Sequence, residues 1–203
     1  DLQAYRGELI RIAQGGAPAT RWQHVFAPLQ AAIQQWQLPV PLLGDLLSAF
    51  LQDIAKTAQA ATYADRAELL DYCRRSANPV GRLLLHLYGV HDAPSLAQSD
   101  AICSALQLIN FWQDLSVDIP RGRYYLSDAD RAAAGITLAA MQQREDTPAL
   151  RQLVADQARW ARALMHSGAP LVHRIPGRAG WELRLVVQGG LRILDKVDAL
   201  QGA

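Results

Sequence analysis

The sequence contains few cysteines and no long uncharged hydrophobic segment. Only Cys73 and Cys103 occur among its 203 residues. Both lie among apolar residues in predicted helices, so we expect reduced thiols, as in a cytoplasmic protein, rather than a disulfide. No run of 18 uncharged apolar residues and no recognisable signal peptide is present, which excludes a membrane-spanning helix.

An excess of charge of one sign is also absent. Lysine and arginine total 20 and aspartate and glutamate 19, a formal net charge of +1, so general nucleic-acid binding is not predicted. The five histidines lack metal-ligand spacing, and no phosphate loop, HExxH or GxSxG motif occurs, which disfavours a hydrolase or zinc enzyme. Half of the residues are hydrophobic, enough for one domain over residues 1–203.

What is present is helical periodicity, so the predicted fold class is all-α, without strands or repeats. Capping residues such as Thr20 and Asp65 mark helix starts, Pro79 predicts a kink, and the adjacent Gly189 and Gly190 predict tight packing. The predicted longer helices are 1–14, 21–36, 42–58, 66–88, 103–118, 148–166 and 179–200, with two short ones between 127 and 147.

The segment 103–118, CSALQLINFWQDLSVD, has an unusual pattern. Taken as one helix with about 100° per residue, its polar side chains fall within an arc of roughly 80°. These polar residues are Cys103, Gln107, Asn110, Asp114 and Asp118. Apolar residues fill the other directions, so we expect this helix to be buried almost all round, with both carboxylates in the interior.

Two buried carboxylates need a proton, a cationic side chain or a metal ion. Asp114 and Asp118 lie one helical turn apart, about 6 Å along the axis, and such a pair suits Mg²⁺ together with water and a substrate phosphate. Arg121 and Arg123 follow immediately and are well placed for that phosphate. The alternative is that Asp118 caps the helix end or pairs with one of these arginines, while Asp114 is solvated.

Three further polar residues are candidates for the site. Tyr72 could direct its ring and hydroxyl into a cavity, or it could be a boundary tyrosine with its hydroxyl at the surface. Asn78 could contact the substrate or satisfy the kinked backbone. Asp53 borders the apolar side of its helix and could point into a central cavity or pair with Lys56.

Two segments together resemble the squalene and phytoene synthase family of head-to-head isoprenoid synthases. The first, DYCRRSANPVGRLLLHLYG, resembles the family's Tyr-started signature, and LQLINFWQDLSVDIPRGRYYL resembles the signature that contains its aspartates. Two residues depart from the second signature. Gln113 stands where the signature usually has Arg or Glu, and Ser127 stands where it usually has Pro. Within the family, the likeness is greatest to the branch that acts in bacterial hopanoid synthesis.

The resemblance implies a helical bundle around a deep central cavity, with Mg²⁺ and diphosphate at its polar end and farnesyl-derived chains in its apolar remainder. From the residue positions and the resemblance together, the predicted functional residues are Asp114 and Asp118 for Mg²⁺, Arg121, Arg123, Asn78 and Asp53 for the substrate, and Tyr72, Gln107 and Asn110 for catalysis. The family's earlier Asp-rich motif and its C-terminal continuation are missing. We therefore expect either truncation at both ends or an incomplete metal cluster.

The implied substrate is presqualene diphosphate or farnesyl diphosphate. The expected reaction converts presqualene diphosphate to hydroxysqualene by diphosphate departure, cation rearrangement and water capture. The alternatives are another head-to-head prenyl synthase, or a non-catalytic relative that acts as an assembly or binding protein. Because the expected product is apolar and the chain has no predicted spanning helix, we expect a cytoplasmic protein in peripheral contact with the inner membrane. No nucleic-acid partner is expected.

Overall fold

A computed structural model describes residues 1–143 and 145–199, and its regular secondary structure there is entirely helical. The all-α prediction is confirmed. The α-helices are α1 (Leu2–Ala13), α2 (Gln23–Trp36), α3 (Val40–Ala58), α4 (Arg66–Ser76), α5 (Asn78–Leu87), α6 (Ala93–Gln113), α7 (Leu115–Asp118), α8 (Asp128–Ala133), α9 (Leu138–Gln142), α10 (Pro148–Gly168) and α11 (Gly177–Ala199). Short 3₁₀ helices are η1 (Thr20–Trp22), η2 (Ile119–Arg121) and η3 (Ala169–His173).

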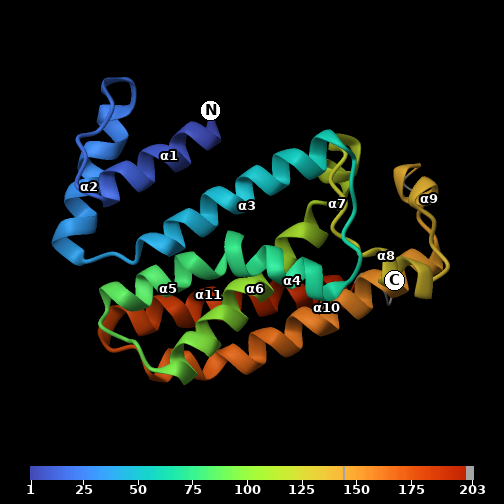
Figure 1. The fold of residues 1–203 in the computed structure, drawn as a ribbon. Helices are drawn as coiled ribbons and strands as arrows, with labels where there is room; N and C mark the ends of the chain where they lie inside the picture. The colour runs from blue at the N-terminus through green and yellow to red at the C-terminus, as the bar shows by residue number, and fades with distance from the viewer. Residues whose placement is uncertain (144, 200–203) are drawn as a thin grey trace.

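Helix α6 is the centre of the bundle (Figure 1). It packs against α10 and α11 on one side and against α4 and α5 on the other, while α3 lies across α4 and α5. Its buried side chains point in several directions, as a helix surrounded by neighbours requires. They include Ile102, Leu108, Ile109, Phe111 and Trp112. Helix α6, which contains the first part of the 103–118 segment, therefore packs on several sides, as the apolar pattern of that segment predicted.

A smaller core joins α1, α2 and the first half of α3. Leu9, Ile12 and Phe26 are its buried residues, and Tyr5 packs its ring edge against Phe26 at a centroid distance of 5.1 Å. Figure 1 shows this pair of helices projecting from the main bundle at the N-terminal end. The candidate residues that the sequence singled out lie outside this smaller core.

Most of the predicted helix starts are capped as expected. Asp65 accepts a hydrogen bond from the Glu68 amide at 2.9 Å, and Ser127 accepts one from the Asp130 amide at 3.2 Å. The prediction for Thr20 was wrong, because this residue lies in η1, and α2 begins three residues later without a side-chain cap.

The predicted helix 66–88 is divided into α4 and α5. Ala77, with φ −119° and ψ −47°, separates them, and Pro79 occupies the first turn of α5. Proline has no amide hydrogen and its ring clashes with the preceding turn, so it is tolerated at a helix start but not in a helix interior. The expected kink is therefore an interruption at Ala77, which divides the predicted helix into the Tyr72 segment and the following apolar helix.

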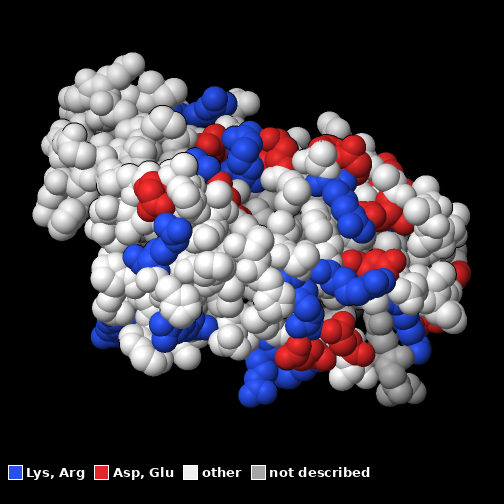
Figure 2. Space-filling view, turned by 90° about the horizontal axis from the view of Figure 1, so that it is seen from below, with Lys and Arg blue, Asp and Glu red and all other residues white. Residues whose placement is uncertain are grey.

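Charged side chains of both signs are mixed on the face seen in Figure 2. In one group of ion pairs, Arg162 on α10 bonds to Asp195 at 2.9 Å and to Asp198 at 2.7 Å, both on α11. Exposed ion pairs of this kind each contribute less than about 1 kcal/mol. None of the helices in the described ranges has an apolar segment long enough to cross a membrane.

Glycines permit close contacts at several helix crossings. A Cβ atom on Gly168 would lie 2.6 Å from the Gln98 carbonyl oxygen, where α10 meets α6. Gly190 is buried against Met165, as the sequence predicts, whereas Gly189 is exposed and has open space around it. Only one glycine of this adjacent pair therefore serves the packing.

The substitutions Gly168→Ala and Gly189→Ala should have opposite effects on stability. We expect Gly168→Ala to lower the free energy of unfolding by about 1 to 3 kcal/mol, because backbone must move to admit the methyl group. Gly189→Ala should raise it by up to about 1 kcal/mol, since alanine favours the helix and meets no neighbour. Urea denaturation measures both, and equal stability of the two variants would contradict the assigned packing.

Candidate active site

The predicted helix 103–118 is interrupted at Asp114. Helix α6 ends at Gln113, Asp114 has φ −97° and ψ 12°, and the short helix α7 follows. Asp114 is exposed, whereas Asp118 has only 8% of its surface exposed. The prediction that both carboxylates are buried was wrong, because the backbone leaves helical geometry at Asp114 and only the following turn enters the interior.

The structure brings together Asp53, Asp118 and Arg123, which come from α3, α7 and the loop after η2. The Arg123 Nη2 atom lies 3.5 Å from Asp53 Oδ2, and its Nη1 atom lies 3.8 Å from Asp118 Oδ1. Lys56 bonds instead to Glu68 at 2.8 Å, so the surface pairing considered for Asp53 is not formed. The arginine pairing considered for Asp118 is present in a loose form.

The carboxyl group of Asp118 is not fully compensated by these neighbours. Burial raises the pKa of Asp118, the guanidinium of Arg123 opposes that change, and the nearby charge of Asp114 adds to it. Burial of a carboxylate disfavours its charged form unless a cation compensates for it. Further positive charge beside Asp118 would therefore stabilise its charged form.

Other residues of the predicted polar stripe lie on the same side of α6. Asn110 is exposed and donates a hydrogen bond from Nδ2 to Asp114 Oδ2 at 2.8 Å. Gln107 is half-buried, about one turn before Asn110. Arg121 is exposed on η2, and its charge also lowers the pKa of Asp118. These groups form a polar margin around the buried carboxylate.

Tyr72 belongs to a buried aromatic cluster. Its ring centroid lies 5.8 Å from that of Tyr63, 6.0 Å from that of Phe111 and 6.5 Å from that of Tyr125. Only 5% of Tyr72 is exposed, so the alternative of a boundary tyrosine at the surface is excluded. Burial, aided by the charge of Asp53, raises the pKa of Tyr72 to about 12, so its hydroxyl stays protonated at neutral pH.

Tyr125 connects the aromatic cluster to the carboxylates, and sequence reasoning did not select it. Its hydroxyl donates a hydrogen bond to Asp53 Oδ1 at 2.9 Å. Its ring stacks on that of Phe111, with a centroid distance of 3.7 Å and an interplanar angle of 6°. The neighbouring Tyr124 instead accepts a hydrogen bond from Gln142 at 3.0 Å. Both tyrosines occur in one loop sequence, so only the position of Tyr125 in the second signature could have distinguished it.

Asn78 lies apart from the carboxylates. It is buried at the start of α5, where its Oδ1 atom accepts a hydrogen bond from the Ser104 hydroxyl at 3.0 Å. This contact joins α5 to α6. Its substrate-binding role stays a prediction, and the observed bond is a helix-to-helix contact.

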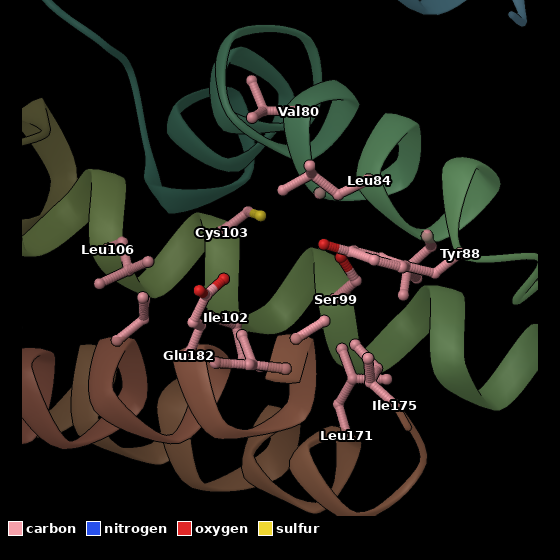
Figure 3. Close-up of a pocket in the computed structure, with 15 residues that line it drawn as sticks. Val80, Leu84, Tyr88, Ser99, Ile102, Cys103, Leu106, Leu171, Ile175 and Glu182 are labelled. Carbon is pink, nitrogen blue, oxygen red and sulfur yellow. The ribbon is translucent and has the colours of Figure 1, made fainter. Parts of the chain in front are cut away.

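An apolar pocket of about 340 Å³ opens between α5, α6 and α11, within the size range of small-molecule sites. Val80 and Leu84 line it from α5, and Leu106 lines it from α6 (Figure 3). Glu182 on α11 directs its carboxylate toward α6 (Figure 3). Cys103 also lines the pocket, so the pocket wall continues along one face of α6 toward the polar margin.

The donor set fits a magnesium ion that is shared with a substrate. Within the described ranges, no group of three or more His, Cys, Asp or Glu side chains is arranged so that it could hold a metal ion. Asp114, directly after α6, and Asp118, at the end of α7, provide two carboxylates. Mg²⁺ is commonly bound by one or two carboxylates, with water and substrate phosphate as the remaining ligands.

The squalene/phytoene synthase family model matches residues 1–203. A hydroxysqualene synthase from Sinorhizobium fredii is 30% identical over 194 residues, which cover 95% of this chain and 63% of that protein. A phytoene synthase from Thermus thermophilus is 31% identical over 189 residues, covering 93% of this chain and 62% of that protein. This chain therefore spans less than two thirds of the length of these relatives.

A solved structure shares the whole described fold. The squalene synthase HpnC from Alicyclobacillus acidocaldarius has a TM-score of 0.89 and 36% sequence identity, over 98% of this chain and 73% of that one. The two signature segments, the helical bundle and the family match thus agree with one another. The chain belongs to the squalene/phytoene synthase family of head-to-head isoprenoid synthases.

Proposed function

We propose that this protein converts presqualene diphosphate to hydroxysqualene. The main support is one observation, namely that α6 lines the apolar pocket and leads through Asp114 into α7, where the Asp118 carboxylate lies beside Arg123. A prenyl diphosphate has the same division into an anionic head and an apolar chain. The similarity to hydroxysqualene synthases supports the choice of substrate.

In this proposal Asp114 and Asp118 bind Mg²⁺, which would supply positive charge to stabilise the departing diphosphate. Arg123 and Arg121 bind diphosphate oxygens, because guanidinium groups match phosphate geometry with several donors. Burial of Asp118 excludes water from its carboxylate and so strengthens its interaction with a cation. These side chains together hold the leaving group away from the carbocation.

The aromatic cluster would face the carbocation. The electron-rich face of Tyr72 attracts a cation by about 0.5 to 2 kcal/mol, and its protonated hydroxyl can donate a hydrogen bond. Gln107 and Asn110, on the polar margin of α6, would orient the Mg²⁺-bound diphosphate or the water that captures the carbocation. The apolar pocket lined by α5 and α11 would hold the hydrocarbon chain.

A second candidate is another head-to-head synthase, which joins prenyl diphosphates such as farnesyl diphosphate into presqualene diphosphate, squalene or a carotenoid precursor. The similarity to a phytoene synthase at 31% identity supports it. Product analysis distinguishes the two candidates. Hydroxysqualene formed from presqualene diphosphate supports the first, and a coupled product formed from farnesyl diphosphate supports the second.

The activity should depend strongly on Asp118. We expect Asp118→Asn to lower the rate more than tenfold at saturating Mg²⁺, since one charged metal ligand is lost. The matched control is Asp195→Asn, because Asp195 is an exposed carboxylate on α11 that pairs with Arg162. A rate loss below about tenfold, equivalent to 1.4 kcal/mol, would overturn the metal assignment.

The same Asp118→Asn variant should be more stable than the wild type without metal. Because burial raises the pKa of Asp118 above its ordinary 3.8, the folded state favours the protonated form more than the unfolded state does. The stability that the wild type gains from this preference for the protonated form is complete below the ordinary pKa of Asp118. It is lost as the pH rises through the pKa of Asp118 in the folded state. Thermal melts in chelator should show a higher melting temperature for Asp118→Asn than for the wild type at pH 7. This difference should close toward pH 4, and a difference independent of pH would contradict the prediction.

Tyr72→Phe and Tyr72→Leu should give graded effects on the reaction. The Phe variant keeps the ring and its attraction for a cation, so it should lose only what the hydroxyl contributes. The Leu variant loses both and should be slower or form altered hydrocarbon products. Product analysis from presqualene diphosphate, with melting temperatures as the control, tests this, and an unchanged rate and product in the Leu variant would place Tyr72 outside the site.

We also propose a cytoplasmic location with peripheral contact to the inner membrane, because the proposed product is apolar. In cell fractionation at low salt, part of the protein should sediment with membranes. Washing at high salt or alkaline pH should release it, as expected for a peripheral protein. The complete absence of a membrane-associated pool at low salt would contradict the proposal.

A further inference from the structure

Arg123 is held between two carboxylates without a tight bond to either. Its distances of 3.5 Å to Asp53 and 3.8 Å to Asp118 exceed the 2.7 to 2.9 Å of a good charge-assisted hydrogen bond. Its Nε atom is buried and has no hydrogen-bond partner in the described part of the chain. A guanidinium offers five donors, so Arg123 retains donors for a further anion.

Asp53, in contrast, is fixed in place. Its Oδ1 atom accepts the Tyr125 hydroxyl at 2.9 Å, and the Tyr125 ring is stacked on Phe111. The Oδ2 atom of Asp53 faces Arg123. The two oxygens thus have different functions, since one anchors the carboxylate and the other attracts the guanidinium.

We propose that Asp53 is a positioning residue that holds Arg123 away from full contact with Asp118. A guanidinium beside a single carboxylate forms two parallel hydrogen bonds with it, which would occupy the oxygens needed for a cation. With Asp53 as a second anion, Arg123 stays between the two carboxylates, Asp118 keeps an accessible oxygen, and the remaining N–H groups face an incoming diphosphate. This inference rests on the proposed function.

The substitution Asp53→Asn separates positioning from simple electrostatics. It removes one negative charge from a site that receives an anion, so through-space electrostatics alone predicts tighter binding of magnesium pyrophosphate. Positioning predicts weaker binding, because Arg123 would close on Asp118. We expect isothermal titration to show affinity about fivefold weaker than that of the wild type.

Matched controls are available for each change. Asp45→Asn removes a charge from the same helix, α3, and should alter the affinity less than twofold. Tyr125→Phe keeps the ring but removes the hydroxyl that anchors Asp53, so it should also weaken binding. It serves as the test if Asp53→Asn fails to fold. Tyr124→Phe removes a hydroxyl that contacts Gln142 instead and should leave binding unchanged. Thermal melts confirm that each variant is folded.

The double variant with Arg123→Gln shows whether Asp53 acts through the arginine. Contacting residues have coupled effects in a double-mutant cycle, so Asp53→Asn should not weaken binding further once Arg123 is absent. An equal weakening in both backgrounds, or tighter binding by the single variant Asp53→Asn, would overturn the inference while leaving the proposed function intact. No binding of magnesium pyrophosphate by the wild type would overturn both.

Discussion

The burial of the Asp118 carboxylate is the constraint around which the site is built. A charge with 8% of its residue surface exposed is costly unless positive charge lies nearby, and the protein provides that charge loosely through Arg123. Three separate segments contribute to this arrangement, since α3 supplies Asp53, α7 supplies Asp118 and the loop after η2 supplies Arg123 and Tyr125. The loose pairing compensates the buried carboxylate only in part, so further positive charge beside Asp118 would stabilise its charged form.

Helix α6 joins structural and chemical tasks in one element. Most of its surface packs against four other helices, which fixes its position, while one face carries Cys103, Gln107 and Asn110 between the apolar pocket and Asp114. Because close packing resists small displacements, side chains on this face keep their spacing. A substrate with an anionic head and an apolar chain would therefore meet both recognition elements along a single rigid wall.

The sequence predicted the helical fold and the packing of the first part of 103–118 on several sides, whereas the roles of the candidate site residues stay predictions. It did not predict the interruption at Asp114, because a helical wheel assumes continuous helix geometry and so assigned equal burial to Asp114 and Asp118. The part played by Tyr125 was also missed, since side-chain directions in a loop depend on tertiary packing. Asp53 could be selected by its position beside an apolar helix face, but its partner Arg123 lies far along the chain.

The break at Ala77 has a consequence for how substrate range can change during evolution. Tyr72 lies on α4 in the aromatic cluster, whereas Val80, Leu84 and Tyr88, from α5 and its end, line the pocket. Because no α4 residue in the described chain lines the pocket, a larger or smaller side chain at Val80 or Leu84 would alter the pocket without replacing any residue of the aromatic cluster. Under the proposed function, chain-length preference would depend on α5 and stabilisation of the carbocation on α4, two features encoded fewer than twenty residues apart.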